Sequence, residues 1–185
     1  MNYLQELWAA LDFGSLRNIL LRLASVFLCL TTHETCHGLA AYALGDPTAK
    51  RMHRLSLNPL RHIDWMGLLM MVTLGFGWAK PVPVDPRYFR KPKQGMALTA
   101  LAGPVSNFLL ALVLLVGARI MVDHAAYSAL NQGILDFLVS TAVLSIGLGL
   151  FNLVPIPPLD GAKVLFSLLP DRMYDTMLRY ERIGM

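Results

Sequence analysis

Residues 30–40 read LTTHETCHGLA and place His33 and His37 four positions apart in an otherwise apolar stretch. On an α-helix, residues at i and i+4 lie on one face about one turn apart, so both imidazoles can reach one metal ion. Glu34 follows the first histidine, where its carboxylate can reach a metal-bound water as general base. Ionisable residues in an apolar segment are costly and usually mark a functional site. The stretch therefore predicts a metal centre within a membrane helix.

The composition is typical of a polytopic α-helical membrane protein. Of the 185 residues, 55% are hydrophobic and 15% are charged, whereas an ordinary soluble domain has about 25% charged residues. The net charge is +4, but the positive residues are clustered, which in a membrane protein indicates topology and lipid headgroups before nucleic acid. We therefore expect contact with a lipid bilayer and no nucleic-acid partner. No cleavable signal peptide is predicted, because residues 1–13 lack a basic start.

The apolar segments predict one domain built on three core transmembrane helices. A short N-terminal interfacial helix precedes them, because its apolar residues recur at helical spacing. The expected order is an interfacial helix at 1–13, a first span at 16–44 with the two histidines, a β-hairpin and re-entrant region at 46–94, a second span at 95–122, a third span at 133–160, and a cytoplasmic tail at 162–185.

The region at residues 46–94 differs in character from the spans. Polar and apolar residues alternate over residues 50–57, which predicts short strands or a hairpin near the membrane surface. The apolar run at 65–79 is short for a spanning helix. Basic clusters flank this run on both sides, so the positive-inside rule places both of its ends in the cytoplasm. A segment with both ends on one side is re-entrant, and it needs protein or a water-filled cavity to cover its backbone.

A catalytic zinc ion usually has three protein ligands and one position for water. Asp160 is the carboxylate that best completes the histidine pair, because it follows a proline-broken stretch that cannot be regular helix. The first and third spans run in the same direction and carry the histidines and Asp160 near their ends, so these groups can meet on the cytoplasmic side. From spacing alone, Asp160 fits equally well as a helix cap in a surface turn before Ala162.

Three spaced motifs resemble the site-2 protease family of intramembrane zinc metalloproteases. They are HETCH at residues 33–37, GPVSN at 103–107 and NLVPIPPLDG at 152–161. Residues 75–84 are also similar to the membrane-associated β-hairpin region of that family. The resemblance covers about residues 16–170. We expect a compact member without an inserted PDZ domain or an appended sensor domain, because the external loop at 123–131 leaves no room for an insertion.

The resemblance implies an intramembrane zinc endopeptidase with one Zn²⁺ per chain, acting in regulated intramembrane proteolysis. His33, His37 and Asp160 would hold the metal, and Glu34 would be the catalytic base. Residues 75–84 would offer a strand edge to the substrate, a membrane protein with a transmembrane segment. The substrate-binding residues that the resemblance implies are Asn107, Asn152, Gly75 and Gly77. We expect an integral protein of a prokaryotic cell membrane with its active site toward the cytoplasm.

Two other interpretations are open at this point. A polytopic transporter or ion-relay protein also uses buried His, Glu and Asp residues and re-entrant segments. A catalytically silent scaffold related to the proteases is the other, and the intact Glu34 argues against it. Two of the three other histidines, at 53 and 62, lie in a basic segment and are predicted to be surface or interface residues rather than metal ligands.

Overall fold

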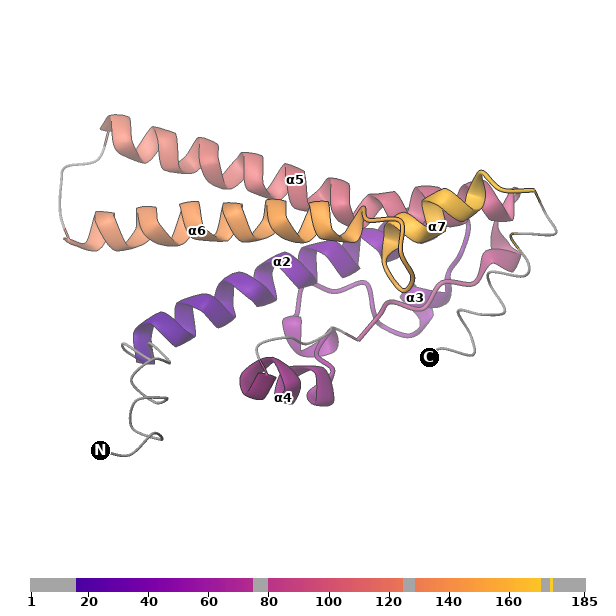
Figure 1. The fold of residues 1–185 in the computed structure, drawn as a ribbon, viewed down its shortest axis with the longest axis horizontal. Coiled ribbons are helices and arrows are strands. Elements are labelled where there is room, and N and C mark those ends of the chain that lie inside the picture. Colours follow the sequence, from indigo (N-terminus) through magenta and orange to yellow (C-terminus); the bar gives the residue numbers. More distant parts are fainter. Residues whose placement is uncertain (1–15, 75–79, 125–128, 171–173, 175–185) are drawn as a thin grey trace.

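The computed structural model describes residues 16–74, 80–124, 129–170 and 174 (Figure 1). The predicted interfacial helix at 1–13 lies outside these residues, as do Gly75 and Gly77. All the regular elements in the described part are helical: α2 Leu16–Ala43, α3 Thr48–Arg51, η1 Pro59–Arg61, α4 Trp65–Leu74, η2 Pro86–Tyr88, α5 Pro92–His124, α6 Ala129–Asn152 and α7 Asp160–Ser167.

The prediction of three spanning helices is confirmed. Three helices are long and apolar enough to cross a membrane, and they cover Asn18–Ala43, Pro92–His124 and Leu130–Asn152. Large apolar side chains on these helices are exposed, such as Leu112 at 58% and Val113 at 68%. An apolar exterior of this extent is expected where the surrounding medium is lipid. The chain is an integral membrane protein.

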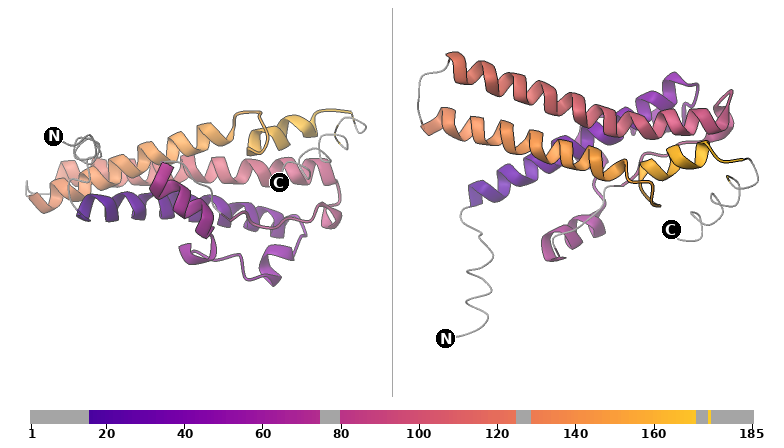
Figure 2. Two further views of the ribbon diagram at one scale, coloured as in Figure 1. Left: turned by 60° about the horizontal axis from the view of Figure 1, so that its bottom comes forward. Right: turned by 45° about the horizontal axis from the view of Figure 1, so that its top comes forward.

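Small and hydroxyl-bearing residues join the three long helices. The antiparallel helices α5 and α6 lie side by side, and α2 crosses them obliquely (Figures 1 and 2). The Ser25 and Thr141 hydroxyls lie 2.6 Å apart between α2 and α6, and the Ser145 hydroxyl donates to the Asn107 carbonyl of α5 at 2.8 Å. Such contacts are typical of membrane helix interfaces, because small residues let the backbones approach closely.

The β-hairpin predicted within residues 46–94 is wrong for the described part of that region, which contains no strand. Several carboxylate and amide side chains instead accept a hydrogen bond from the N–H two residues ahead, which favours a helical turn. Prolines also supply no N–H for a strand ladder. These side-chain acceptors and their N–H donors are Asp46 with Thr48, Asn58 with Leu60, Asp64 with Met66, and Asp85 with Arg87.

The short helix α4 occupies the start of the predicted re-entrant run. Its ten residues span about 15 Å at 1.5 Å per residue, which is half of the roughly 30 Å core of a bilayer. It lies away from the three long helices in Figure 1 and in the right view of Figure 2. Its re-entrant placement in a membrane stays a prediction.

Two buried side chains fix the extended segment at residues 80–84 beside α2. The Arg54 guanidinium donates to the backbone carbonyls of Arg61, Lys80 and Pro81. Asp46, which is fully buried, accepts from the Asp85 N–H at 2.7 Å. These bonds bring the segment next to the helix that carries the histidine motif.

Two of the three histidines outside the motif, His53 and His62, differ in their surroundings. His53 is exposed, as predicted. His62, predicted to be a surface or interface residue, is only 2% exposed, so the surface position is excluded. Its Nε2 lies 2.7 Å from the Ser56 carbonyl and 3.4 Å from the Thr35 hydroxyl. His62 therefore packs the 56–62 loop against α2, a role that the basic character of this segment did not reveal.

Candidate metal centre

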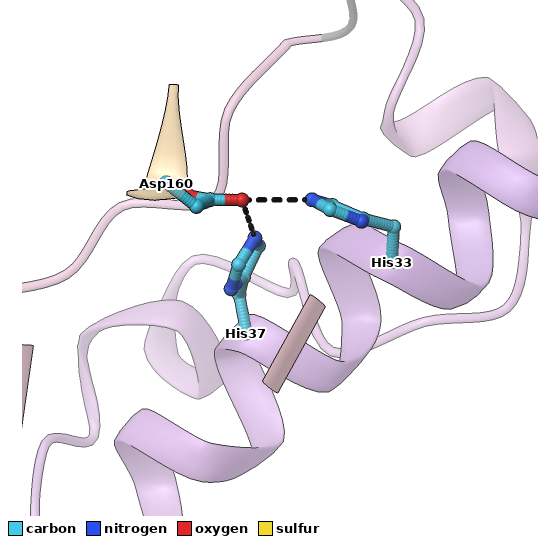
Figure 3. Close-up of side chains that lie close together, drawn as sticks. All are labelled: His33, His37 and Asp160. Carbon is cyan, nitrogen blue, oxygen red and sulfur yellow. Dashed lines mark hydrogen bonds and ion pairs between the residues drawn. The ribbon is translucent and has the colours of Figure 1, made fainter. Parts of the chain in front are cut away.

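The three predicted ligands come together in the folded chain. Asp160 Oδ2 lies 3.0 Å from His33 Nε2 and 3.1 Å from His37 Nε2 (Figure 3). The histidines come from successive turns of α2, and Asp160 is the first residue of α7. All three residues are buried, and their potential ligand atoms lie within 4.8 Å of one another. This is a compact set of two nitrogen donors and one oxygen donor.

The turn between α6 and α7 delivers Asp160 to the histidines. Leu159 is the N-cap of α7, with extended backbone and no side-chain cap bond. Asp160 is 7% exposed and directs its carboxylate at the imidazoles. It is therefore not a helix cap in a surface turn. A Cβ at Gly161 would collide with the Leu153 and Val154 carbonyls. Only glycine therefore lets the start of α7 fold against the end of α6.

Lys163 is a further neighbour of the Asp160 carboxylate. Its Nζ lies 3.6 Å from Asp160 Oδ1, the oxygen that does not face the histidines. Burial opposes ionisation of Asp160. When the two Nε2 atoms carry protons, hydrogen bonds from His33 and His37 and the charges of His37 and Lys163 outweigh burial, so the pKa of the carboxyl is held well below its ordinary value. The side chain is therefore a carboxylate at neutral pH, the form that binds metals.

The Thr99 carbonyl of α5 fixes the tautomer of His37. His37 Nδ1 lies 2.6 Å from the Thr99 oxygen, which can only accept, so Nδ1 carries a proton. A neutral His37 then has a lone pair at Nε2, which faces Asp160 Oδ2 at 3.1 Å. Two acceptors at this distance repel, so the pair needs a cation between them, either a proton or a metal ion. Carbonyl-oriented histidines of this kind are typical of metal sites.

Asn107 of α5 contacts His33 at Nδ1, the ring nitrogen that does not face Asp160. Its Nδ2 lies 3.1 Å from His33 Nδ1, while its Oδ1 has no hydrogen-bond partner. The Asn107 side chain is fully buried. Nδ1 of His33 therefore faces a side-chain amide, whereas Nδ1 of His37 faces a backbone carbonyl.

Gly103 forms the wall of the site on α5. A Cβ at this position would collide with the Nε2 atoms of both His33 and His37. No side chain can therefore be accommodated between α5 and the paired imidazoles. The glycine lets α5 approach α2 closely enough for Thr99 and Asn107 to reach the two histidines.

Glu34 is held by the extended segment at residues 80–84. Its Oε2 accepts a hydrogen bond from the Val82 N–H at 2.9 Å. The side chain is partly exposed, unlike the two histidines on either side of it. A carboxylate next to the histidine pair with a fixed orientation is suited to accept a proton from a nearby water.

The donor set fits a zinc ion. Zinc binds histidine nitrogen and carboxylate oxygen at about 2.0–2.2 Å, so ligand atoms around tetrahedral zinc lie about 3.3 Å apart. The distances of 3.0 and 3.1 Å between Asp160 and the histidines are close to this value. Three ligands leave one tetrahedral position for water. The residues present are therefore those that a catalytic zinc site requires.

Of the other predicted site residues, Gly75 and Gly77 lie outside the described residues and Asn152 lies apart from this cluster. Asn152, the last residue of α6, donates its amide to the Leu148 carbonyl at 2.9 Å rather than to any of the three candidate ligands. Sequence reasoning missed the contributions of Thr99, Lys163 and the Val82 N–H. Only Lys163 carried a signal, because it lies at i+3 from Asp160 on a helix.

Several known proteins are similar in sequence to this chain. Residues 116–183 match the model of peptidase family M50. The chain is 39% identical over 165 residues to the "Putative zinc metalloprotease YwhC" of Bacillus subtilis, covering 86% of this chain and 74% of that protein. It is 32% identical over 153 residues to the "Putative zinc metalloprotease Rip2" of Mycolicibacterium smegmatis, covering 79% and 56%.

The relatives differ in length from this chain. This chain spans 53% of the length of the "Putative zinc metalloprotease Rip2" of Mycobacterium tuberculosis, with 34% identity over 146 residues. No solved structure matches the chain. The identity to YwhC over most of both chains shows the family. The chain belongs to peptidase family M50, the site-2 protease family of membrane zinc metalloproteases.

Proposed function

We propose that the protein is an intramembrane zinc endopeptidase that cleaves the transmembrane segments of membrane-protein substrates. The observation that carries the proposal is the convergence of two α2 histidines and the first carboxylate of α7 on one point. Membership of a peptidase family favours hydrolysis over other uses of such a site.

In this proposal His33, His37 and Asp160 hold one zinc ion. When bound, zinc lowers the pKa of a water molecule and polarises the scissile carbonyl. Thr99 holds the His37 ring in the orientation that leaves Nε2 free, and Lys163 neutralises the outer oxygen of Asp160. The residues around the ligands thus keep the cluster in one geometry.

Glu34 is the catalytic base in this proposal. It takes a proton from the attacking water and passes it to the leaving amine. The Val82 N–H keeps its carboxylate oriented before the reaction. Because the same turn of α2 carries Glu34 and His33, the helix backbone fixes the position of the base relative to this ligand.

The substrate must be locally unwound, because a transmembrane helix hides its peptide bonds in its own hydrogen bonds. Asn107, Asn152 and residues 75–84 are the proposed contacts for the unwound chain. Over residues 80–84 the Lys80 N–H is bonded to His62 and the Val82 N–H to Glu34, and the two prolines have none. Strand pairing there would therefore rely on the Val84 N–H and on free carbonyls.

The location in the cell is also part of the proposal. The histidines lie in the second half of α2, and Asp160 follows α6, so the site lies toward one end of the helical bundle (Figure 1). The basic clusters at this end favour the cytoplasmic face of a prokaryotic cell membrane. The transporter interpretation has no support from the family.

An assay of the purified protein against a panel of single-span helices tests the proposal. The expected result is cleavage within the apolar segment of at least one helix, abolished by a chelator and restored by Zn²⁺. Ion flux across vesicles without cleavage of any panel member would favour the transporter interpretation instead.

A further inference from the structure

The two histidine ligands have different groups behind them. His37 Nδ1 faces the Thr99 carbonyl, an acceptor that permits only one tautomer. His33 Nδ1 faces the Asn107 side-chain amide at 3.1 Å, a group with a donor end and an acceptor end. The tautomer of His33 therefore depends on which end of the amide faces it.

With Nδ2 toward the ring, Asn107 donates to His33 Nδ1, so a neutral His33 carries its proton on Nε2. That proton bonds to Asp160 Oδ2 at 3.0 Å, and Nε2 has no lone pair for a metal. With Oδ1 toward the ring, Nδ1 donates and the Nε2 lone pair faces the site. The two orientations have the same shape, so rotation of the amide exchanges them without repacking.

The orientation of the Asn107 amide matters because the side chain is buried, where an unpaired polar group is costly. Asn107 is fully buried, and its Oδ1 has no partner in the described part of the chain. The Ser145 hydroxyl holds the Asn107 backbone carbonyl at 2.8 Å, which anchors the residue from α6. Since Gly103 keeps α5 close to α2, the Asn107 amide is the hydrogen-bond partner of His33 Nδ1 within the described residues.

We propose that Asn107 is a positioning residue that sets the tautomer of His33, turning its Oδ1 to Nδ1–H when the site holds zinc. Asn107 thus does for His33 what the Thr99 carbonyl does for His37. The inference rests on the zinc site of the proposed function. It differs from a substrate-groove role, because it acts on metal affinity in the absence of substrate.

The test measures the zinc dissociation constant of the full-length protein in detergent by competition with a chromophoric chelator, without substrate. Asn107→Asp keeps the shape and offers only acceptor oxygens, so it should bind zinc at least as tightly as the wild type. Asn107→Leu offers no acceptor and should bind about 10- to 100-fold more weakly, the usual effect of losing such a partner. Thr141→Val, which removes a buried hydroxyl that bonds to Ser25 and Phe137 rather than to Asn107 or a candidate ligand, is the control and should match the wild type.

Each outcome decides the inference. Equal zinc affinity for Asn107→Leu and the wild type contradicts it, and so does an equal loss in both Asn107 variants. If Asn107→Leu does not fold, a tenfold or greater loss in Asn107→Asp contradicts it. Nitrogen-15 shifts of the zinc-loaded wild type should show His33 protonated at Nδ1. Lack of stoichiometric zinc in the wild type would contradict the proposed function as well, whereas the other adverse outcomes contradict this inference alone.

Discussion

The Val82 backbone N–H donates to Glu34 Oε2 across 2.9 Å, so an extended segment far along the chain orients the proposed base. Val82 lies between two prolines, so Val82→Pro removes the N–H in a segment that already has the extended backbone proline prefers. We expect kcat to fall by about tenfold, as for loss of one hydrogen bond to a charged group. Zinc content should be unchanged, because Val82 touches no candidate ligand.

Val82→Ala is the matched control, since it shortens the side chain and keeps the N–H. Its kcat should stay near the wild-type value. If both Val82 variants lose activity equally, side-chain packing rather than the N–H is what matters at this position.

Gly103→Ala should abolish zinc binding or weaken it at least about 100-fold. The added Cβ collides with both Nε2 atoms, so α5 must move away or the imidazoles must turn from Asp160. Zinc content of the purified variant measures this. Gly117→Ala on the same helix is the control, because a Cβ there meets nothing within 4 Å. Wild-type zinc affinity in Gly103→Ala would contradict the close packing of α5 against the site.

Lys163→Met should weaken zinc binding by no more than about fivefold. The lysine is partly exposed, and ion pairs of this kind contribute about 0–1 kcal/mol. The loss should shrink at high ionic strength, since salt screens the pair. Lys163→Arg keeps the charge and should bind zinc like the wild type. A loss for Arg as large as that for Met would show that charge is not the cause.

Thr141→Val should lower the free energy of unfolding by about 0.6 kcal/mol, the average for hydrogen bonds between membrane helices. The Thr141 hydroxyl lies 2.6 Å from that of Ser25 and joins α6 to α2. Ser140→Ala removes an exposed hydroxyl that bonds only within α6, at the Phe137 carbonyl. It should leave stability unchanged in the same unfolding measurement, whereas equal losses would indicate a general effect of hydroxyl removal.

The long helices and the three candidate ligands could be predicted because their signals are local or periodic. An apolar run of sufficient length indicates a span, and the spacing of His33 and His37 places them on one helical face. Spacing alone does not distinguish a role of Asp160 as metal ligand from a role as helix cap, because its environment depends on where the α6–α7 turn folds. The prediction that Asp160 is a metal ligand therefore depends on the resemblance to the family motif.

The region between the first two spans could not be predicted in the same way. Alternation over residues 50–57 predicts strands, but Asp46 and Asn58 start short helical turns at the two ends of this stretch by accepting backbone N–H groups. The contacts behind the ligands were also hidden. A carbonyl such as that of Thr99, or the N–H of Val82, carries no side-chain signal, so its role appears only when helices and loops are placed together.

The most direct test of the central claim compares zinc content and cleavage in the purified wild type, Glu34→Gln and Asp160→Asn. The wild type should hold one zinc ion per chain and cleave a membrane-embedded helix. Glu34→Gln should retain the zinc and lose cleavage, whereas Asp160→Asn should lose both. Retained cleavage by Glu34→Gln, or full zinc content in Asp160→Asn, would contradict the assignment of Glu34 as base and Asp160 as third ligand.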